Sequence, residues 1–266
     1  MRSHLATRTD AATPDTGNQA GTVASIMWER DVAEVYDETS AAMFDPAVLG
    51  PTVDLLADLA GGGRALELAI GTGRVAIPLS ARGIPVCGIE LSPHMAAQLA
   101  AKPAAAAVSV TVGDMTTTRV DGTFTVVYLV YNTIMNVTTQ HEQVAVFANA
   151  AAHLGPGACF VVEVGVPQLR RLPPDEIGRV FEMQPGHVGI ETFDDHVGQI
   201  SWSHHWMDVD GRLVRHSAPY RYVWPSELDL MAQLAGLRLR NRWAGWSKEL
   251  FTSESTSQVA VYEKPA

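Results

Sequence analysis

The sequence predicts a doubly wound α/β fold, in which helices cover both faces of an open, mostly parallel sheet and an antiparallel β meander is inserted near the end. Two observations predict it. Between residues 64 and 166, short runs with apolar residues at consecutive positions alternate with helical segments, which is typical of parallel strands buried on both faces. From residue 187 to 224, apolar and polar residues alternate instead, and the turn signals Asp194-Asp195 and Asp210-Gly211 indicate antiparallel strands.

Two helices are expected before the first strand. Over residues 28–44, apolar side chains from Val32 to Met43 recur at intervals of three and four, which is a helical period. A second helix is expected over residues 46–60, because Gly61-Gly62-Gly63 is a natural stop.

The alternating elements then follow in order. Ser92 before Pro93 is the usual order of an N-cap and a first helical residue, so it marks the start of one helix. Strands are expected at 64–70, 84–91, 108–114, 123–131, 158–166, 237–246 and 257–264, and helices at 74–83, 93–102, 141–154 and 225–236.

These elements divide the chain into four parts. We expect a flexible tail over residues 1–25, a Rossmann-like core with N-terminal helices over 26–166, an antiparallel insertion over 167–224, and a last helix with terminal core strands over 225–266. The aromatic side chains are concentrated in the C-terminal half, which suits the insertion as a lid over an apolar substrate pocket.

The amino-acid composition argues against some classes of binding partner. The net charge of −10 argues against binding to nucleic acid, which needs a basic footprint. The N-terminal residues lack an apolar run, so we expect no signal peptide and no membrane anchor. The two cysteines, Cys87 and Cys159, lie in strand-like runs and are expected to be buried thiols of a cytoplasmic protein, for which a homo-oligomer remains open.

A glycine loop follows the first core strand, with the sequence Glu67-Leu-Ala-Ile-Gly71-Thr-Gly73-Arg74. It could be a plain strand-to-helix turn, or it could bind a dinucleotide, since Gly71 to Ala76 fits the loose GxGxxA pattern. Glu67 favours a third interpretation. A carboxylate there would repel a pyrophosphate but attract the methionine ammonium of S-adenosylmethionine (SAM).

Acidic residues also end the next two strands. Glu90 can accept hydrogen bonds from both ribose hydroxyls, although this role is shared with NAD enzymes. Asp114 can hold the adenine amine beside the flexible apolar side chain of Met115, or it can simply cap a turn. Ligands of open α/β sheets bind at the carboxyl ends of strands, so three acids in these places together predict a nucleoside site.

The stretches ALELAIGTGRVAIPLSARG, GIELSPHM, VGDMTTT and HLGPGACFVVEV, within residues 64–164, resemble the successive motifs of class I SAM-dependent methyltransferases. The resemblance implies a Rossmann-like, seven-stranded sheet with an antiparallel last strand, and S-adenosylhomocysteine (SAH) as the cofactor product. Ala69 replaces a glycine that is common in the family, and we expect its methyl group to be tolerated if the backbone there is extended. More loosely, YDETSAAMF, YNTIMN and RYVWPSELDLMAQLAGLRL resemble the small-molecule, antibiotic-tailoring branch, which includes amino-sugar and lincosamide N-methyltransferases.

The resemblance and the motifs together predict the site residues. Cofactor contacts are expected from Tyr36, Glu67, Ala69, Gly71, Gly73, Arg74, Glu90, Leu91, Met95, Asp114, Met115 and Tyr131. Substrate contacts are expected from Phe44, Asn132, Asn136, His204 and Arg221. Tyr36, Tyr131 and His204 are the candidates for catalysis, although Tyr36 could instead pack its helix onto the core and Arg221 could pair with an acidic side chain rather than a substrate carboxylate.

The insertion is rich in histidine, at positions 187, 196, 204, 205 and 216. No metal is expected, because His204 and His205 point to opposite faces of a strand. His204 ranks first as a general base, since alternation places it with Trp202 and Trp206, although a structurally bonded histidine is the alternative.

The leading hypothesis is an enzyme that moves a methyl group from SAM to an amine or hydroxyl of a small metabolite by in-line displacement, without nucleic-acid or membrane partners. The choice between nitrogen and oxygen stays open. Two alternatives remain, an NAD-dependent oxidoreductase of Rossmann type and a non-catalytic SAM-fold protein that mediates assembly.

Overall fold

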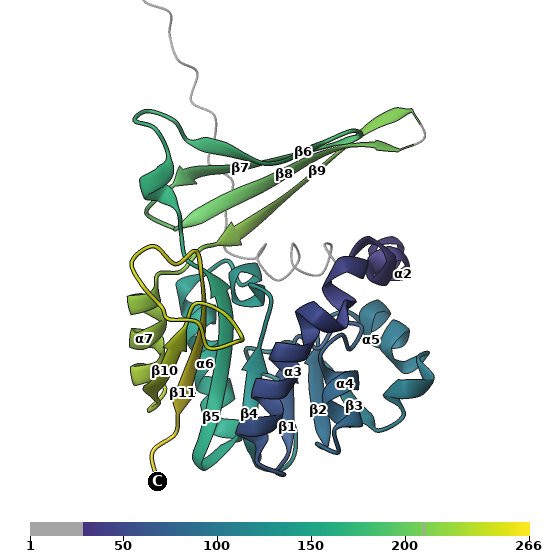
Figure 1. Ribbon diagram of the computed structural model, residues 1–266, viewed down its shortest axis with the longest axis vertical. Helices are drawn as coiled ribbons and strands as arrows, with labels where there is room; N and C mark the ends of the chain where they lie inside the picture. Colours follow the sequence, from purple (N-terminus) through teal and green to yellow (C-terminus); the bar gives the residue numbers. More distant parts are fainter. Residues whose placement is uncertain (1–28, 210) are drawn as a thin grey trace, which may run out of the picture.

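A computed structural model describes residues 29–209 and 211–266, which form two sheets (Figure 1). Within these residues, sheet A has seven strands in the order β10-β11-β5-β4-β1-β2-β3. Strand β11 is antiparallel to both of its neighbours, whereas the pairings among β1 to β5 are parallel, so the predicted fold class is confirmed. The strands are β1 Ala65–Leu68, β2 Val86–Glu90, β3 Val108–Val112, β4 Phe124–Leu129, β5 Leu154–Gly165, β10 Arg238–Trp243 and β11 Ser257–Glu263.

The strand order reverses between β1 and β4, which lie side by side although two strands separate them in sequence. The chain leaves β1 toward one edge of the sheet and returns at β4 toward the other, so the loops at their carboxyl ends diverge and leave a crevice. A site is therefore expected above β1, β2 and β4.

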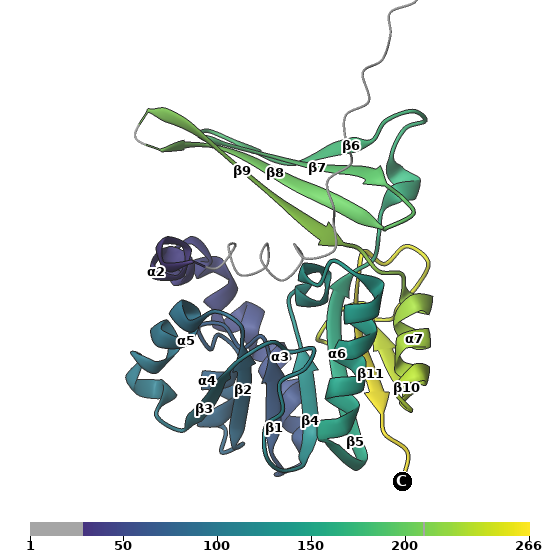
Figure 2. The ribbon, with the colours of Figure 1, turned by 180° about the vertical axis from the view of Figure 1, so that it is seen from behind.

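Helices cover both faces of sheet A (Figures 1 and 2). Along β4, Val126 and Tyr128 belong to one buried cluster with helix α3, while Val127 and Leu129 belong to another with helices α6 and α7. Both faces of the strand are thus buried, which explains its consecutive apolar residues. The helices are α2 Arg30–Thr39, α3 Pro46–Ala60, α4 Ala76–Ala81, α5 Pro93–Ala100, α6 Gln140–His153 and α7 Pro225–Leu234, with 3₁₀ turns η1 Ala41–Phe44, η2 Pro103–Ala105, η3 Thr133–Asn136 and η4 Leu169–Arg171.

The helix ends follow their sequence signals. Asp45 caps α3 by accepting the backbone N–H of Ala47 at 2.8 Å, and Gly61 ends that helix with a left-handed backbone. The predicted helix over 28–44 is instead broken at Ser40, after which η1 continues to Phe44. The predicted tail over 1–25 lies outside the described residues.

Sheet B is a separate antiparallel sheet in the order β6-β7-β8-β9, with strands Gly178–Gln184, His187–Asp195, Ile200–Val209 and Arg212–Arg221. It lies across the end of sheet A where β1, β2 and β4 terminate (Figure 1). Strand β6 was not predicted, because a bulge between Val180 and Glu182 interrupts its alternation. The β7–β8 turn also falls slightly later than the Asp194-Asp195 signal, at residues 196–199.

None of the helices within residues 29–209 and 211–266 has the length and apolar character required to cross a lipid bilayer.

Candidate functional site

The glycine loop joins β1 to α4, and its two glycines serve different purposes. Both have a positive φ, +58° at Gly71 and +83° at Gly73. A Cβ atom on Gly71 would meet only a methyl group of Met95, at 3.6 Å, so the space above Gly71 is open. A Cβ atom on Gly73 would lie 2.3 Å from Leu99 of α5. Gly71 therefore leaves room for a ligand, whereas Gly73 permits close packing of α5.

The backbone conformation of Ala69 differs from the predicted one. Its φ is +54°, in the left-handed region, and not extended as expected. The chain turns sharply as it leaves β1, and the backbone N–H of the next residue, Ile70, then donates to Ile89 on β2 at 3.0 Å. A left-handed alanine is strained, which explains why glycine is common at such a position.

Glu90, the last residue of β2, joins the loops that follow β1 and β2. Its carboxylate accepts the backbone N–H of Gly71 at 2.7 Å and that of Ser92 at 2.8 Å. Burial raises the pKa of Glu90, and these backbone hydrogen bonds act against that effect. Each carboxylate oxygen has a second lone pair, so Glu90 can still accept two ligand hydroxyls.

Glu67 does not occupy the position expected of it. Its side chain is buried, accepts the hydroxyl of Tyr128 at 2.9 Å, and approaches the backbone N–H of Ala76 at the start of α4. Burial raises the pKa of Glu67 to about 8, despite the opposing hydrogen bond from Tyr128. The carboxyl therefore lies beneath the glycine loop and is directed toward Tyr128, so this direction does not support the contact with a ligand ammonium that was expected of Glu67.

Three cavities follow one another above the carboxyl end of sheet A. The inner cavity, of about 110 Å³, includes Ala69, Glu90, Leu91, Asp114, Met115, Thr133 and Asn136. The middle cavity, of about 290 Å³, includes Tyr36, Ala69, Gly71, Glu90, Met95, Tyr131, Asn132, Thr133, Asn136 and Tyr220. The outer cavity, of about 400 Å³, lies beneath sheet B and includes Asn132, Arg179, Phe181, Glu191, Phe193, Ser203, Tyr220 and Tyr222. Neighbouring cavities share wall residues, so the three lie next to one another.

Asp114 lines the inner cavity and also caps a turn. Its Oδ1 atom accepts both the backbone N–H and the hydroxyl of Thr116, each at 2.7 Å. The turn-capping alternative is thus present in the structure, alongside Met115 in the wall of the same cavity.

The segment after β4 is held by the end of β5. Tyr131 and Asn132 both have positive φ, of 57° and 60°. The backbone N–H of Tyr131 donates to the Glu163 carboxylate at 2.8 Å, and the Asn132 side chain accepts the N–H of Gly165 at 2.6 Å. The guanidinium of Arg74 lies 5.2 Å from the Tyr131 ring. These contacts fix both residues in the wall of the middle cavity.

Phe44 is not with the other predicted substrate residues. It lines a separate cavity of about 540 Å³ between α2, α3 and α4, together with Gly73 and Arg74. The ammonium of Lys102 lies 5.5 Å from its ring. The break after α2 directs η1 toward α3, so the prediction of substrate contact for Phe44 is not supported.

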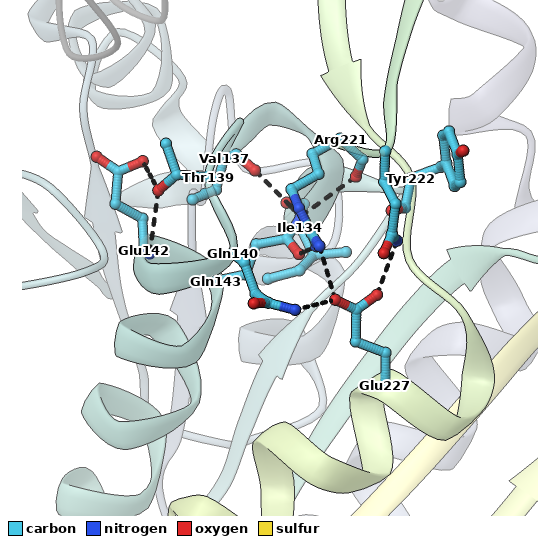
Figure 3. Close-up of polar contacts among 10 residues, drawn as sticks. Ile134, Val137, Thr139, Gln140, Glu142, Gln143, Arg221, Tyr222 and Glu227 are labelled. Atoms are coloured by element: carbon cyan, nitrogen blue, oxygen red, sulfur yellow. Dashed lines mark hydrogen bonds and ion pairs between the residues drawn. The ribbon is translucent and has the colours of Figure 1, made fainter. Parts of the chain in front are cut away.

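Arg221 is a structural residue, and its acidic partner is Glu227. Its guanidinium donates to Glu227 on α7 at 2.7 Å and to Gln143 on α6 at 2.5 Å, and its side chain is only 4% exposed (Figure 3). The amide nitrogen of Gln143 in turn donates to the backbone oxygens of Ile134, Val137 and Arg221. The network ties the end of β9 to the core helices, so the substrate role predicted for Arg221 is not supported.

His204 lies on the wrong face of sheet B for a base in the outer cavity. It stacks beside Trp202, as expected, and its Nδ1 contacts the Ser217 hydroxyl at 2.8 Å. Ser203 and Tyr220 line the outer cavity, and side chains alternate along a strand, so His204 points away from it. The residue that shares the cavity face is His205.

Sequence reasoning also missed a polar row in the outer cavity. Arg179, Glu191 and Ser203 lie opposite one another on β6, β7 and β8, and Arg179 contacts Glu191 at 2.8 Å. Alternation could have grouped these side chains with His205, but the orientation of the sheet relative to the core was needed to show which face is covered.

Comparison with known proteins assigns the family. The family described as methyltransferase domain matches residues 65–157. The cypemycin N-terminal methyltransferase of Streptomyces sp is 26% identical over 239 residues, which cover 86% of this chain and 98% of that protein.

Solved structures agree with this. The CcbJ methyltransferase from Streptomyces caelestis has a TM-score of 0.73 and 32% identity, covering 81% of this chain and 89% of that one. The SAM-bound amino pentose methyltransferase CalS10 from Micromonospora echinaspora shares the fold, with a TM-score of 0.61 and 21% identity over 80% of this chain and 90% of that one. The oxidoreductase and assembly-protein alternatives are therefore set aside. The chain belongs to the SAM-dependent methyltransferases.

Proposed function

We propose that this enzyme methylates an amine nitrogen of a small organic molecule that enters the outer cavity, with sheet B as its lid. The supporting observation is that the middle and outer cavities adjoin, because Asn132 and Tyr220 belong to the walls of both. An acceptor beneath sheet B would therefore meet the cofactor beside these two residues. The name of the cypemycin N-terminal methyltransferase, which describes an amine acceptor, favours nitrogen over oxygen.

The residues present fit SAM. The ribose hydroxyls would be held by Glu90, and the adenine would lie in the inner cavity with Leu91, Asp114 and Met115. The methionine end would lie in the middle cavity, over the open side of Gly71. Tyr36, Met95 and Tyr131 also line that cavity, while Gly73, Arg74 and Glu67 shape the loop and its surroundings.

The chemistry needs orientation more than a reactive side chain. When bound, SAM supplies a methyl group on a positively charged sulfur; the acceptor nitrogen bonds to that carbon while the carbon–sulfur bond breaks and its electron pair stays on sulfur. The rings of Tyr36, Tyr131 and Tyr220 surround the middle cavity, and aromatic faces favour positive charge. As a lid over the outer cavity, sheet B would limit access of water, and Asn132, held by β5, would help to orient the acceptor.

The outer cavity limits the size and the polarity of the acceptor. Its volume of about 400 Å³ suits a compact molecule or the end of a longer one, such as an amino sugar or a peptide N-terminus. Phe193 and Tyr222 supply apolar wall, while the Arg179–Glu191 pair supplies both charges and can meet a polar, zwitterionic or multiply hydroxylated acceptor.

Cofactor binding is tested by calorimetry with SAH. We expect Glu90→Ala to weaken binding about 10- to 100-fold, since charge-assisted hydrogen bonds to the ligand and to the Gly71 backbone are lost. Glu38→Ala, on the exposed side of α2, is the control for loss of one carboxyl. Equal affinity in both variants would contradict the placement of the ribose.

Acceptor chemistry is tested with matched pairs of compounds. Amino sugars and short peptides with a free N-terminus are incubated with enzyme and SAM, beside analogues in which a hydroxyl replaces the amine, and methylation is read by mass spectrometry. We expect methylated amines. Methylation of the hydroxyl analogues alone would refute the nitrogen assignment while leaving the family unaffected.

A further inference from the structure

We infer that Ser203, His205, His187 and Glu182 form a proton relay that carries the proton lost by the acceptor amine from the outer cavity to solvent. The inference rests on the proposed amine acceptor. It concerns the cavity face of sheet B, which the cofactor residues do not use.

Ser203, His205 and His187 form a hydrogen-bonded row on two neighbouring strands, and the Glu182 carboxylate on a third strand lies at ion-pair distance from the end of the row. Ser203 Oγ and His205 Nε2 are 3.0 Å apart, both on β8. His205 Nδ1 and His187 Nε2, on β7, are 2.9 Å apart. His187 Nδ1 and the Glu182 carboxylate, on β6, are 3.4 Å apart. The row begins at a residue that lines the cavity, and the carboxylate beyond its other end is 38% exposed.

One assignment of protons satisfies the whole row. A neutral imidazole has one N–H donor and one acceptor nitrogen, and an ionised carboxylate only accepts. With the Glu182 carboxylate 3.4 Å from its Nδ1 atom, His187 keeps its proton on Nδ1, directed toward Glu182, and accepts at Nε2. His205 then donates from Nδ1 to His187, and Ser203 donates its hydroxyl proton to His205 Nε2. The Ser203 oxygen is left as an acceptor on the cavity side, where an acceptor N–H can reach it.

This polarity moves protons in one direction. The acceptor ammonium gives a proton to Ser203 Oγ as the Ser203 proton passes to His205 Nε2. The Nδ1 proton of His205 passes to His187 Nε2, and the Nδ1 proton of His187 passes to Glu182, which releases it to water. One proton enters, one leaves, and the nitrogen keeps the lone pair that it needs for methyl transfer. Both rings are left with their proton on Nε2, and proton exchange with water returns them to the Nδ1–H form before the next turnover, so no further reactant is required.

The surroundings of His205 keep its imidazole neutral, so the ring can accept a proton. The edge of Phe181 covers its ring, at a centroid distance of 5.4 Å, and His205 pairs across the sheet with His216 on β9. The charged or titratable groups around it are His187, His216, Glu182 and His204. Burial, followed by the nearby imidazoles of His187 and His216, lowers the pKa of His205, so the ring is neutral at physiological pH.

A neutral imidazole suits an ammonium better than a hydroxyl. An alkyl ammonium is a far stronger acid than an aliphatic hydroxyl, so the transfer of its proton to imidazole through Ser203 costs much less free energy. The relay is thus consistent with an amine acceptor. Because His205 and His187 act through Ser203, they are positioning residues, and of the four relay residues only Ser203 touches the substrate.

The first test needs no acceptor. In uniformly ¹⁵N-labelled full-length enzyme at pH 8, long-range ¹H–¹⁵N correlation spectra report the tautomer of each histidine, and His187→Gln and His205→Gln assign the signals. We expect the Nδ1–H tautomer in both rings. An Nε2–H tautomer in His205 would overturn the relay whatever the enzyme methylates.

The second test uses the best amine found in the matched panel. We expect Ser203→Ala and His205→Gln each to lower kcat at pH 7 by about 10- to 100-fold and to leave SAH affinity unchanged. The deficit should shrink as pH rises, because the free amine needs no relay, and imidazole should restore part of the activity of His205→Gln. His196→Gln, in the exposed β7–β8 turn, is the control.

Two outcomes overturn the relay. A loss that is equal at every pH would indicate a structural role, and a larger loss in His204→Gln than in His205→Gln would move the base to the other face of sheet B. If the panel yields no methylated amine, the proposed function fails by itself, whereas the tautomer spectra still judge the relay.

Discussion

Replacement of Glu67 by glutamine should stabilise the protein increasingly as pH rises. The Glu67 carboxyl is buried, accepts a hydrogen bond from Tyr128, and has its pKa raised from 4.5 to about 8. Because the folded pKa lies above the unfolded one, the folded state binds more protons than the unfolded state between these values, so the free energy of unfolding falls as pH rises through this window.

The size of the effect follows from the shift. One pKa unit corresponds to about 1.4 kcal/mol, so between pH 5 and pH 7.5 the wild type should lose about 3 kcal/mol of stability through Glu67 alone. Glutamine does not titrate, and it can still accept the Tyr128 hydroxyl. The variant should therefore gain about 3 kcal/mol relative to wild type over the same interval.

Urea unfolding at pH 5, 6.25 and 7.5, followed by circular dichroism, measures this difference. Glu38→Gln, on the exposed side of α2, controls for removal of a carboxyl. A stability difference between Glu67→Gln and wild type that is independent of pH would show that the carboxyl is ionised in the fold, and would restore the charged partner of the methionine ammonium that the sequence suggested.

Three further substitutions test the packing of the site by urea unfolding. Gly73→Ala should cost about 1–3 kcal/mol more than Gly83→Ala, because both have φ near +83° but only Gly73 faces a methyl group of α5 at 2.3 Å; equal costs would contradict the steric argument. Ala69→Gly should stabilise by up to about 1 kcal/mol by relieving a left-handed alanine, and a destabilised variant would refute that strain. Arg221→Met should cost about 1–3 kcal/mol by leaving the partly buried Glu227 without its cation, and Arg221→Met/Glu227→Leu should recover much of this; no recovery would count against the pair.

Much of the site was predictable because it lies on regular elements. The period of the apolar residues located each parallel strand, and ligands of such sheets bind at the carboxyl ends of those strands. Position alone therefore predicted Glu90, Asp114 and Met115 as ligand contacts, and the structure places all three in the wall of the inner cavity. The resemblance added Tyr36 and Tyr131, and the structure places both in the wall of the middle cavity.

The predictions that the structure does not support concern the direction in which side chains point. Period-two alternation correctly grouped His204 with Trp202, but a strand has two equivalent faces, and only the docking of sheet B onto the core shows which face is covered. Glu67 was expected to point at a ligand, yet its side chain turns beneath the loop toward Tyr128. Arg221 found its partner on α7, six residues further along the chain.

The amino-acid sequence by itself determined the order and type of the elements, the glycine loop and the family, since these depend on local periodicity and on short motifs. Tertiary structure alone decided which side chains line the same cavity, how burial changes the ionisation of Glu67, and how residues from β6, β7 and β8 lie next to one another. The physical reason is that side-chain direction and solvent exclusion arise from contacts between segments far apart in the chain, which local patterns do not encode.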